Sequence, residues 1–206
     1  SGVFKSPSLF VFSPISDKID CIFLSIFLLL GLLILYQIDC EYTTFSFGIF
    51  VTMNILIVVA TSNELLRNQF TDCEVLISGV GMIYTTISLT KELIRNNYDL
   101  VINVGIAGSF VEKFKIGDVV EVVADCFSEI GTEVGDKFLT PTQLNLEIKN
   151  TFFTERKTDL NKAIGITVNT VHGKASSIAK IRNRLNPDIE SMEGAAVMMV
   201  CEQFNT

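Results

Sequence analysis

The chain has 206 residues, with 16 Lys and Arg against 23 Asp and Glu, one His, five Cys and no Trp. A formal net charge of −7 excludes a protein that binds nucleic acid through its phosphates, because such binding needs clustered Lys and Arg. A hydrophobic fraction of 49% excludes global disorder. The odd number of Cys, without paired Cys-x-x-Cys spacing, argues against a disulfide scaffold or a zinc module.

The first 52 residues differ in composition from the rest of the chain. They hold half of the 16 Phe and an apolar run at 21–36, which as a helix would span roughly 24 Å, less than the hydrocarbon core of a bilayer. Met53 is the first Met, and an apolar run follows it directly. We therefore expect 1–52 to be a hydrophobic segment outside the native domain, with a marginal membrane anchor as the alternative. The domain itself is predicted at 53–206.

Beyond Met53 the sequence repeats the order strand, small-residue turn, helix. Apolar runs predict buried strands, followed by helices with turn residues at their ends. The predicted strands are 54–60, 73–78, 99–104, 118–128, 163–169 and 188–192, and the predicted helices are 82–96, 144–153, 175–185 and 193–204. This order predicts an α/β fold with a layered sheet and with ligands at the carboxyl ends of its strands.

Several common catalytic motifs are absent from the sequence. The turn Gly79-Val80-Gly81 is half of a dinucleotide-binding fingerprint, but Tyr84 stands where the third Gly would be. The sequence has no GxxxxGK[ST] and no GxSxG, and its single His lacks a nearby acid and nucleophile pattern. A nicotinamide-binding enzyme, a P-loop protein and a Ser-His-Asp hydrolase are therefore disfavoured.

Two carboxylates follow predicted strands. Glu64 comes just after the first strand, and Glu193 stands between the last strand and the last helix. A carboxylate at the carboxyl end of a strand faces the ligand crevice in a sheet of this class. The structural alternatives are a surface acid for Glu64 and a helix-start residue for Glu193.

Five motifs make the sequence resemble a known family. MNILIVVATSNE at 53–64, SGVGM at 78–82, NVGIAGSF at 103–110, TVNTVHG at 167–173 and ESMEGAA at 190–196 occur in this order. Together they resemble the purine nucleosidase branch of the nucleoside phosphorylase superfamily, with the best match to the futalosine hydrolases. The resemblance implies a three-layer, mixed-sheet nucleoside phosphorylase-like fold, truncated before its last strand and helix.

The same resemblance implies an activity and the residues that carry it. The expected reaction is hydrolysis of the N-ribosidic bond of futalosine to hypoxanthine and dehypoxanthine futalosine, a step of menaquinone biosynthesis. By match, Glu64 would activate water and Glu193 would hold the ribose hydroxyls, and the expected substrate-binding residues are Ile106, Ala107, Gly108, Val171, His172, Ser191 and Met192.

The family's donor to the leaving purine is a Ser-Asp or Ser-Asn pair on a strand downstream of the ESMEGAA helix. The chain ends at Thr206, so we expect this fragment to lack the donor and to turn over poorly. The alternatives are a methylthioadenosine/S-adenosylhomocysteine nucleosidase, a nucleoside phosphorylase and a non-catalytic nucleoside-binding protein. A phosphorylase is disfavoured because 60–63 (Ala-Thr-Ser-Asn) offers neither a Gly-rich anion loop nor an Arg.

The remaining expectations concern partners. The chemistry needs carboxylates, a hydrogen-bond donor and water, so no metal and no organic cofactor are expected. The expected partner is a small purine nucleoside, with no nucleic acid, and with a membrane only if 21–36 is a real anchor. The resemblance implies a homo-oligomer, and the predicted location is cytoplasmic.

Overall fold

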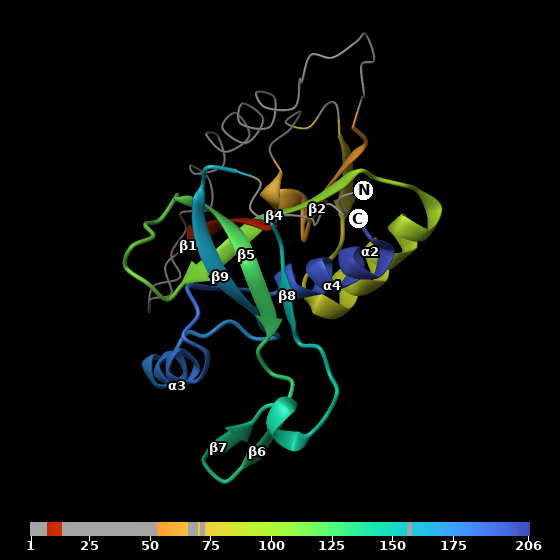
Figure 1. Cartoon of the computed structure of the whole chain (residues 1–206). Helices are drawn as coiled ribbons and strands as arrows, with labels where there is room; N and C mark the ends of the chain where they lie inside the picture. The colour runs from red at the N-terminus through yellow and green to blue at the C-terminus, as the bar shows by residue number, and fades with distance from the viewer. Residues whose placement is uncertain (1–7, 14–52, 66–69, 71–72, 156–157) are drawn as a thin grey trace.

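A computed structural model describes residues 8–13, 53–65, 70, 73–155 and 158–206 (Figure 1). Its centre is an eight-stranded sheet of parallel and antiparallel pairs. The strands are β1 (Ser8–Ser13), β2 (Ile55–Val59), β3 (Glu74–Ile77), β4 (Leu100–Ser109), β5 (Val119–Phe127), β8 (Thr151–Phe153), β9 (Asn161–Thr167) and β10 (Ile189–Ser191). They pair in the order β1-β5-β9-β10-β4-β2-β3, with β8 beside β5. Because β1 also pairs with β4, part of the sheet closes into a ring.

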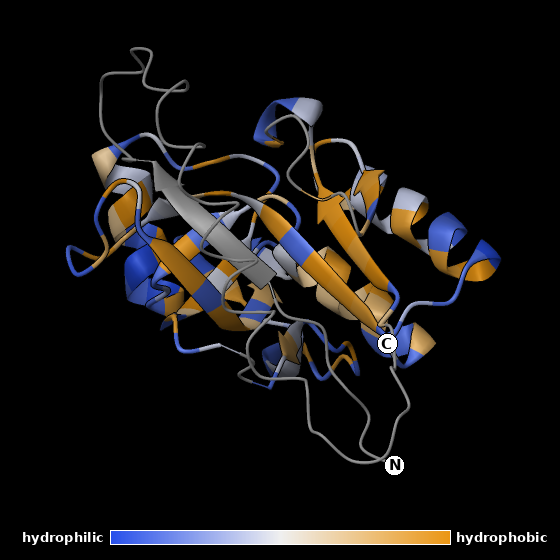
Figure 2. Ribbon diagram, turned by 90° about the horizontal axis from the view of Figure 1, so that it is seen from above, coloured by the Kyte–Doolittle hydropathy of each residue, from blue (hydrophilic) through white to orange (hydrophobic). Residues whose placement is uncertain are grey.

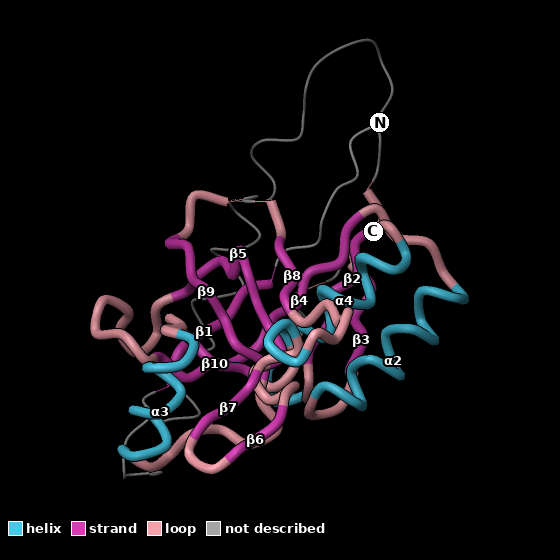
Figure 3. Tube along the Cα trace, turned by 60° about the horizontal axis from the view of Figure 1, so that its bottom comes forward, coloured by secondary structure: helices cyan, strands magenta, loops and turns pink. Residues whose placement is uncertain are grey.

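Among the described residues, three helices pack against this sheet. They are α2 (Met82–Arg95), α3 (Ala175–Leu185) and α4 (Gly194–Phe204), and η1 (Ser62–Glu64) and η2 (Thr142–Leu144) are short 3₁₀ turns. α2 and α4 lie side by side, while α3 lies apart from them (Figures 1 and 3). The predicted α/β class with a mixed sheet is confirmed.

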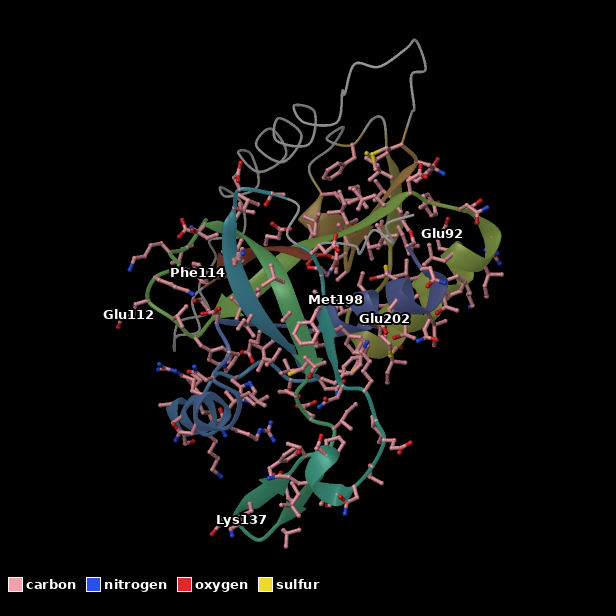
Figure 4. The ribbon with its side chains drawn as sticks, in the orientation of Figure 1. Glu92, Glu112, Phe114, Lys137, Met198 and Glu202 are labelled. Atoms are coloured by element: carbon pink, nitrogen blue, oxygen red, sulfur yellow. The ribbon has the colours of Figure 1, made fainter. Side chains whose placement is uncertain are left out.

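Apolar side chains fix this arrangement. Leu89 of α2 and Val197 of α4 pack in one buried cluster with Leu56 and Val58 of β2, whereas Ile57 and Val59, the alternate residues of β2, belong to a cluster on the other face. Strands that are apolar on both faces must be covered on both. Figure 2 shows strands of the sheet that are mostly hydrophobic and are interrupted in places by polar residues. Met198 of α4 is buried in a third cluster, and its side chain lies between α4 and the sheet in Figure 4.

One predicted element is wrong. Residues 144–153 do not form a helix: η2 ends at Leu144, and Thr151–Phe153 is strand β8, antiparallel to β5. Phe152 is buried and meets Phe127 of β5 edge to face, with 5.7 Å between ring centroids. Pairing with a neighbouring strand decided this conformation. A hairpin of β6 (Thr132–Val134) and β7 (Lys137–Leu139), which the sequence did not predict, extends from the body, with Lys137 at its end (Figure 4).

Strand β4 is longer than predicted. The expected strand ended at 104 and was followed by a small-residue turn, but β4 continues to Ser109. Its last residues are held on both sides, because Gly108 pairs with Ser13 of β1 and with Glu190 of β10. The small residues 105–108 therefore lie within a strand.

The N-terminal segment contributes to the sheet through β1. Ser8–Ser13 runs parallel to β4 and antiparallel to β5. The other residues of 1–52, including 21–36, lie outside the described residues, and the boundary at Met53 stays a prediction. Within the described part of the chain, no helix has the length and apolar character needed to cross a membrane.

Candidate functional site

Glu64 lies at the carboxyl end of β2, as the sequence predicts. It closes η1, and its Oε2 accepts a hydrogen bond from the backbone N–H of Thr61 at 2.9 Å. This is a capping box, in which the chain reverses immediately after the strand and turns the carboxylate back toward the strand end. Burial raises the pKa of Glu64 above its ordinary value, and hydrogen bonds from the backbone of Thr61 and Ala60 partly oppose this rise.

Glu193 lies at the junction of β10 and α4. Its Oε1 accepts the backbone N–H of Gly81 at 2.8 Å, and its Oε2 accepts the backbone N–H of Met192 at 3.2 Å. Burial raises the pKa of Glu193, while the hydrogen bond from Gly81 lowers it and the charge of Glu64 raises it further. The tertiary structure thus brings the two predicted carboxylates close enough for their charges to interact.

The Gly79-Val80-Gly81 turn links the end of β2, near Glu64, to Glu193. The sequence reasoning missed this link. The N–H of Gly79 donates to the carbonyl of Ala60, at the end of β2, at 3.1 Å. Gly81 has φ +91°, a backbone conformation that favours Gly, and its N–H points at Glu193. The turn therefore holds the carboxylate of Glu193 in place through the N–H of Gly81, and it is fixed to the end of β2 through the N–H of Gly79.

Strand β4 contains the three residues that the sequence predicts as the floor of the site. Ala107 and Gly108 are buried and Ile106 is half-buried. Gly108 pairs with Glu190, one residue before Ser191, so the floor and the carboxyl end of β10 are neighbours in the sheet.

Two predicted residues have structural contacts of their own. Ser191 is buried, and its Oγ accepts the N–H of Gly194 at 3.2 Å, which satisfies one of the free donors at the start of α4. Met192 packs against the cluster that contains Phe110, Ile166 and Ile181. Their contacts with a substrate stay predictions.

Val171 and His172 lie in the loop after β9. Val171 is exposed, and His172 is half-buried. The His172 backbone N–H donates to Oε1 of Glu190 at 2.9 Å, and its Nδ1 lies 2.6 Å from Oε2 of the same carboxylate. Sequence reasoning did not single out Glu190, although it belongs to the ESMEGAA motif.

A second buried carboxylate network supports the start of α4. Asp125 of β5 accepts a hydrogen bond from the Thr167 hydroxyl at 3.0 Å, and that hydroxyl accepts the N–H of Ala195 at 2.7 Å. Burial raises the pKa of Asp125 to about 7. Its Oδ2 has no hydrogen-bond partner among the described residues. Sequence reasoning missed this network too, because its members come from β5, β9 and α4.

The arrangement suits reactions that use carboxylates and water. Two half-buried carboxylates, Glu64 and Glu193, lie near each other at the carboxyl ends of β2 and β10, and the small residues of β4 are neighbours of β10 in the sheet. A carboxylate whose pKa is raised takes up a proton more readily than an exposed one, and another can stabilise positive charge on a ligand. No group of three or more His, Cys, Asp or Glu suited to a metal ion occurs among the described residues.

These features define the class as an α/β protein with a two-carboxylate site at the edge of a curled mixed sheet. The family model of the phosphorylase superfamily matches residues 58–206, and the chain belongs to this family. The predicted nucleoside phosphorylase-like fold is thereby confirmed.

Two curated relatives match this chain over only part of their own length. The 5′-methylthioadenosine/S-adenosylhomocysteine nucleosidase of Buchnera aphidicola subsp. Schizaphis graminum is 27% identical over 141 residues, which are 63% of this chain and 60% of that protein. A second Buchnera nucleosidase is 26% identical over 140 residues, or 55% of its length. The chain thus spans less than two thirds of these relatives.

Solved structures of two kinds of nucleosidase share the fold. Native futalosine hydrolase of Helicobacter pylori gives a TM-score of 0.62 at 16% identity, covering 76% of this chain and 84% of that one. A mutant of the H. pylori methylthioadenosine nucleosidase, with 5′-methylthioadenosine in its active site, gives 0.63 at 17% identity, covering 76% and 82%. At these identities the likeness concerns the fold, and it does not distinguish the two substrates.

Proposed function

We propose that the protein hydrolyses the N-ribosidic bond of a purine nucleoside, with Glu64 as the base that activates water and Glu193 as the acceptor of the ribose hydroxyls. The observation that carries this proposal is the pair of half-buried carboxylates at the carboxyl ends of β2 and β10, where the charge of Glu64 acts on Glu193. A carboxylate whose pKa is raised by burial is a stronger base than an exposed one.

The chemistry requires each part of this arrangement. The C1′–N9 bond breaks, its electron pair leaves with the purine, and positive charge builds on the sugar. An ionised Glu193 beside the ribose would stabilise that charge. Water adds its oxygen to C1′ and gives its proton to Glu64, while a donor protonates the departing base.

The substrate we propose first is futalosine, which would give hypoxanthine and dehypoxanthine futalosine. GIAGSF at 105–110 and TVNTVHG at 167–173 support this choice. The second candidate is methylthioadenosine or S-adenosylhomocysteine, because the curated relatives are nucleosidases for these compounds. A nucleoside-binding protein without turnover is the non-catalytic alternative.

We assign none of the described residues as the donor that protonates the leaving purine. Strand β1 suggests a candidate for this donor. It runs parallel to β4, and its last residue, Ser13, pairs with Gly108, one of the predicted floor residues. In the sequence, Pro14-Ile15-Ser16-Asp17 follows β1, and it contains a Ser-Asp pair of the kind expected for the donor. We therefore include Asp17→Asn among the variants to be assayed.

We also propose that the protein is a homo-oligomer. Helix α2 exposes several large apolar side chains, of which Ile83, Tyr84 and Ile94 are each at least two thirds exposed. Exposed apolar residues gathered on one helix are typical of a surface that another protein covers.

The test is release of free base by the full 206-residue chain. Futalosine, methylthioadenosine and inosine are incubated with the protein, with and without phosphate, and the products are separated by chromatography. We expect hypoxanthine from futalosine at a rate independent of phosphate. Because Asp17 would take the place of the downstream donor, we expect this activity to be lost in Asp17→Asn.

Other outcomes would redirect the proposal. Adenine from methylthioadenosine would establish the second candidate, and a requirement for phosphate would mean that Glu64 does not activate water. If the folded chain binds a nucleoside and releases no base, the non-catalytic alternative holds.

A further inference from the structure

The pair formed by His172 and Glu190 is not used in the reaction proposed above. Glu190 is a fully buried carboxylate in β10, between β9 and β4. Both its oxygens face His172, one toward the backbone N–H at 2.9 Å and the other toward Nδ1 at 2.6 Å. The imidazole also meets Phe110 edge to face, with 6.2 Å between ring centroids. One carboxylate therefore fixes both the loop and the orientation of the ring.

This geometry determines what the other ring nitrogen presents. The proton between Nδ1 and Oε2 can belong to the imidazole or to the carboxyl group. If the pair holds two protons, the second one is on Nε2 in either case, and Nε2 is a donor. If the pair holds one proton, it bears a net negative charge and Nε2 is an acceptor.

Burial favours the form with two protons. That form is electrically neutral overall, whether it is an ion pair or a carboxylic acid with a neutral imidazole, and a buried site disfavours net charge. Glu129 adds a further negative charge nearby, which opposes the singly protonated form. Nε2 has no hydrogen-bond partner among the described residues, and the His172 side chain keeps 18% of its surface exposed. An N–H group is thus available to a ligand.

The position of the pair relates it to the base of the nucleoside. Glu190 pairs with Gly108 in the floor and stands three residues before Glu193. His172 lies in the loop where the base is expected to bind. Hypoxanthine has an oxygen at purine position 6, which only accepts hydrogen bonds, whereas adenine has an amino group there, which donates them.

We propose that Nε2–H of His172, held in the donor state by Glu190, selects 6-oxopurines over 6-aminopurines. The inference rests on the proposed function, because it assumes that the base occupies this loop. It favours hypoxanthine-bearing nucleosides such as futalosine or inosine over methylthioadenosine.

Binding of the free bases tests the inference without any need for turnover. Hypoxanthine and adenine are titrated separately into the full chain by isothermal calorimetry. We expect wild type to bind hypoxanthine at least about tenfold more tightly, because an amino group facing Nε2–H would leave two donors without acceptors. In His172→Phe an aromatic ring remains and the donor is lost, so this preference should fall by about tenfold.

Glu190→Gln is the matched variant. Its amide oxygen can accept the His172 N–H and its amide NH₂ can donate to Nδ1, which leaves the proton on Nε2. The hypoxanthine preference should therefore survive in Glu190→Gln. If the His172–Glu190 pair only ordered the loop, the result would differ, because His172→Phe would then weaken the binding of both bases equally.

The outcomes separate the two proposals. If folded wild type binds both bases with equal affinity, or prefers adenine, the selection of 6-oxopurines is wrong, although the hydrolase proposal stands. If hypoxanthine is preferred and His172→Phe keeps that preference, His172 is not the selecting residue. If neither base binds to folded wild type, the assignment of a purine site fails, and the inference fails with it.

Discussion

Replacing Glu64 by Gln should lower the rate of base release by roughly a hundredfold to ten-thousandfold, the usual contribution of a general base. The amide keeps the size of the side chain and can still accept the N–H of Thr61 through its oxygen. It cannot take a proton from water. The measurement is the single-turnover rate with the best nucleoside of the panel.

The pH profile gives an independent check on this role. Glu64 must be ionised to act as a base, and burial raises its pKa. Activity should therefore be lost as pH falls, at a higher pH than for an exposed Glu. Because the charge of Glu64 helps to raise the pKa of Glu193, that pKa should be lower in Glu64→Gln.

Glu112→Gln is a suitable control for the loss of one negative charge. Glu112 is exposed in the connection between β4 and β5, and its side chain points away from the body in Figure 4. We expect the rate of this variant to equal that of wild type. A Glu64→Gln variant as active as Glu112→Gln would contradict the assignment of Glu64 as the base.

Replacing Gly194 by Ala should destabilise the protein by about 3 kcal/mol, the upper part of the range for overpacking a filled core. Gly194 is buried at the start of α4, and an added Cβ would overlap Oδ2 of Asp125. Neither side can move easily, because Asp125 is bonded to Thr167, which in turn bonds the N–H of Ala195. The measurement is chemical denaturation followed by circular dichroism.

Two variants make this prediction specific. Gly173→Ala adds the same methyl group where nothing lies within 4 Å of the new Cβ, and its stability should stay within about 0.5 kcal/mol of wild type. In Gly194→Ala/Asp125→Ala the obstructing carboxylate is removed, so the double variant should lose less stability than the two single variants summed. Additive losses would show that Asp125 is not what excludes a side chain at position 194.

The sequence by itself determined the elements whose cause is local. Helix α3 has the predicted bounds, Ala175–Leu185, because Asn186 and Pro187 stop it. Strands β2, β3 and β5 were predicted from runs of apolar residues, since a strand covered on both faces needs such a run. The positions of Glu64 and Glu193 at strand ends also followed from the sequence.

Only the tertiary structure decided which of these residues meet. The N–H of Gly81 reaches Glu193 across 112 positions of the chain, and no local pattern encodes that contact. The same holds for Glu190 with His172 and for Asp125 with Thr167, which the pairing of β9 with β10 and with β5 brings together. Residues 151–153 became a strand because β5 offered free backbone groups beside a pocket for Phe152. Backbone pairing and burial depend on neighbours distant in sequence. Local propensity therefore determined most of the helices and strands, whereas packing determined which residues form the site.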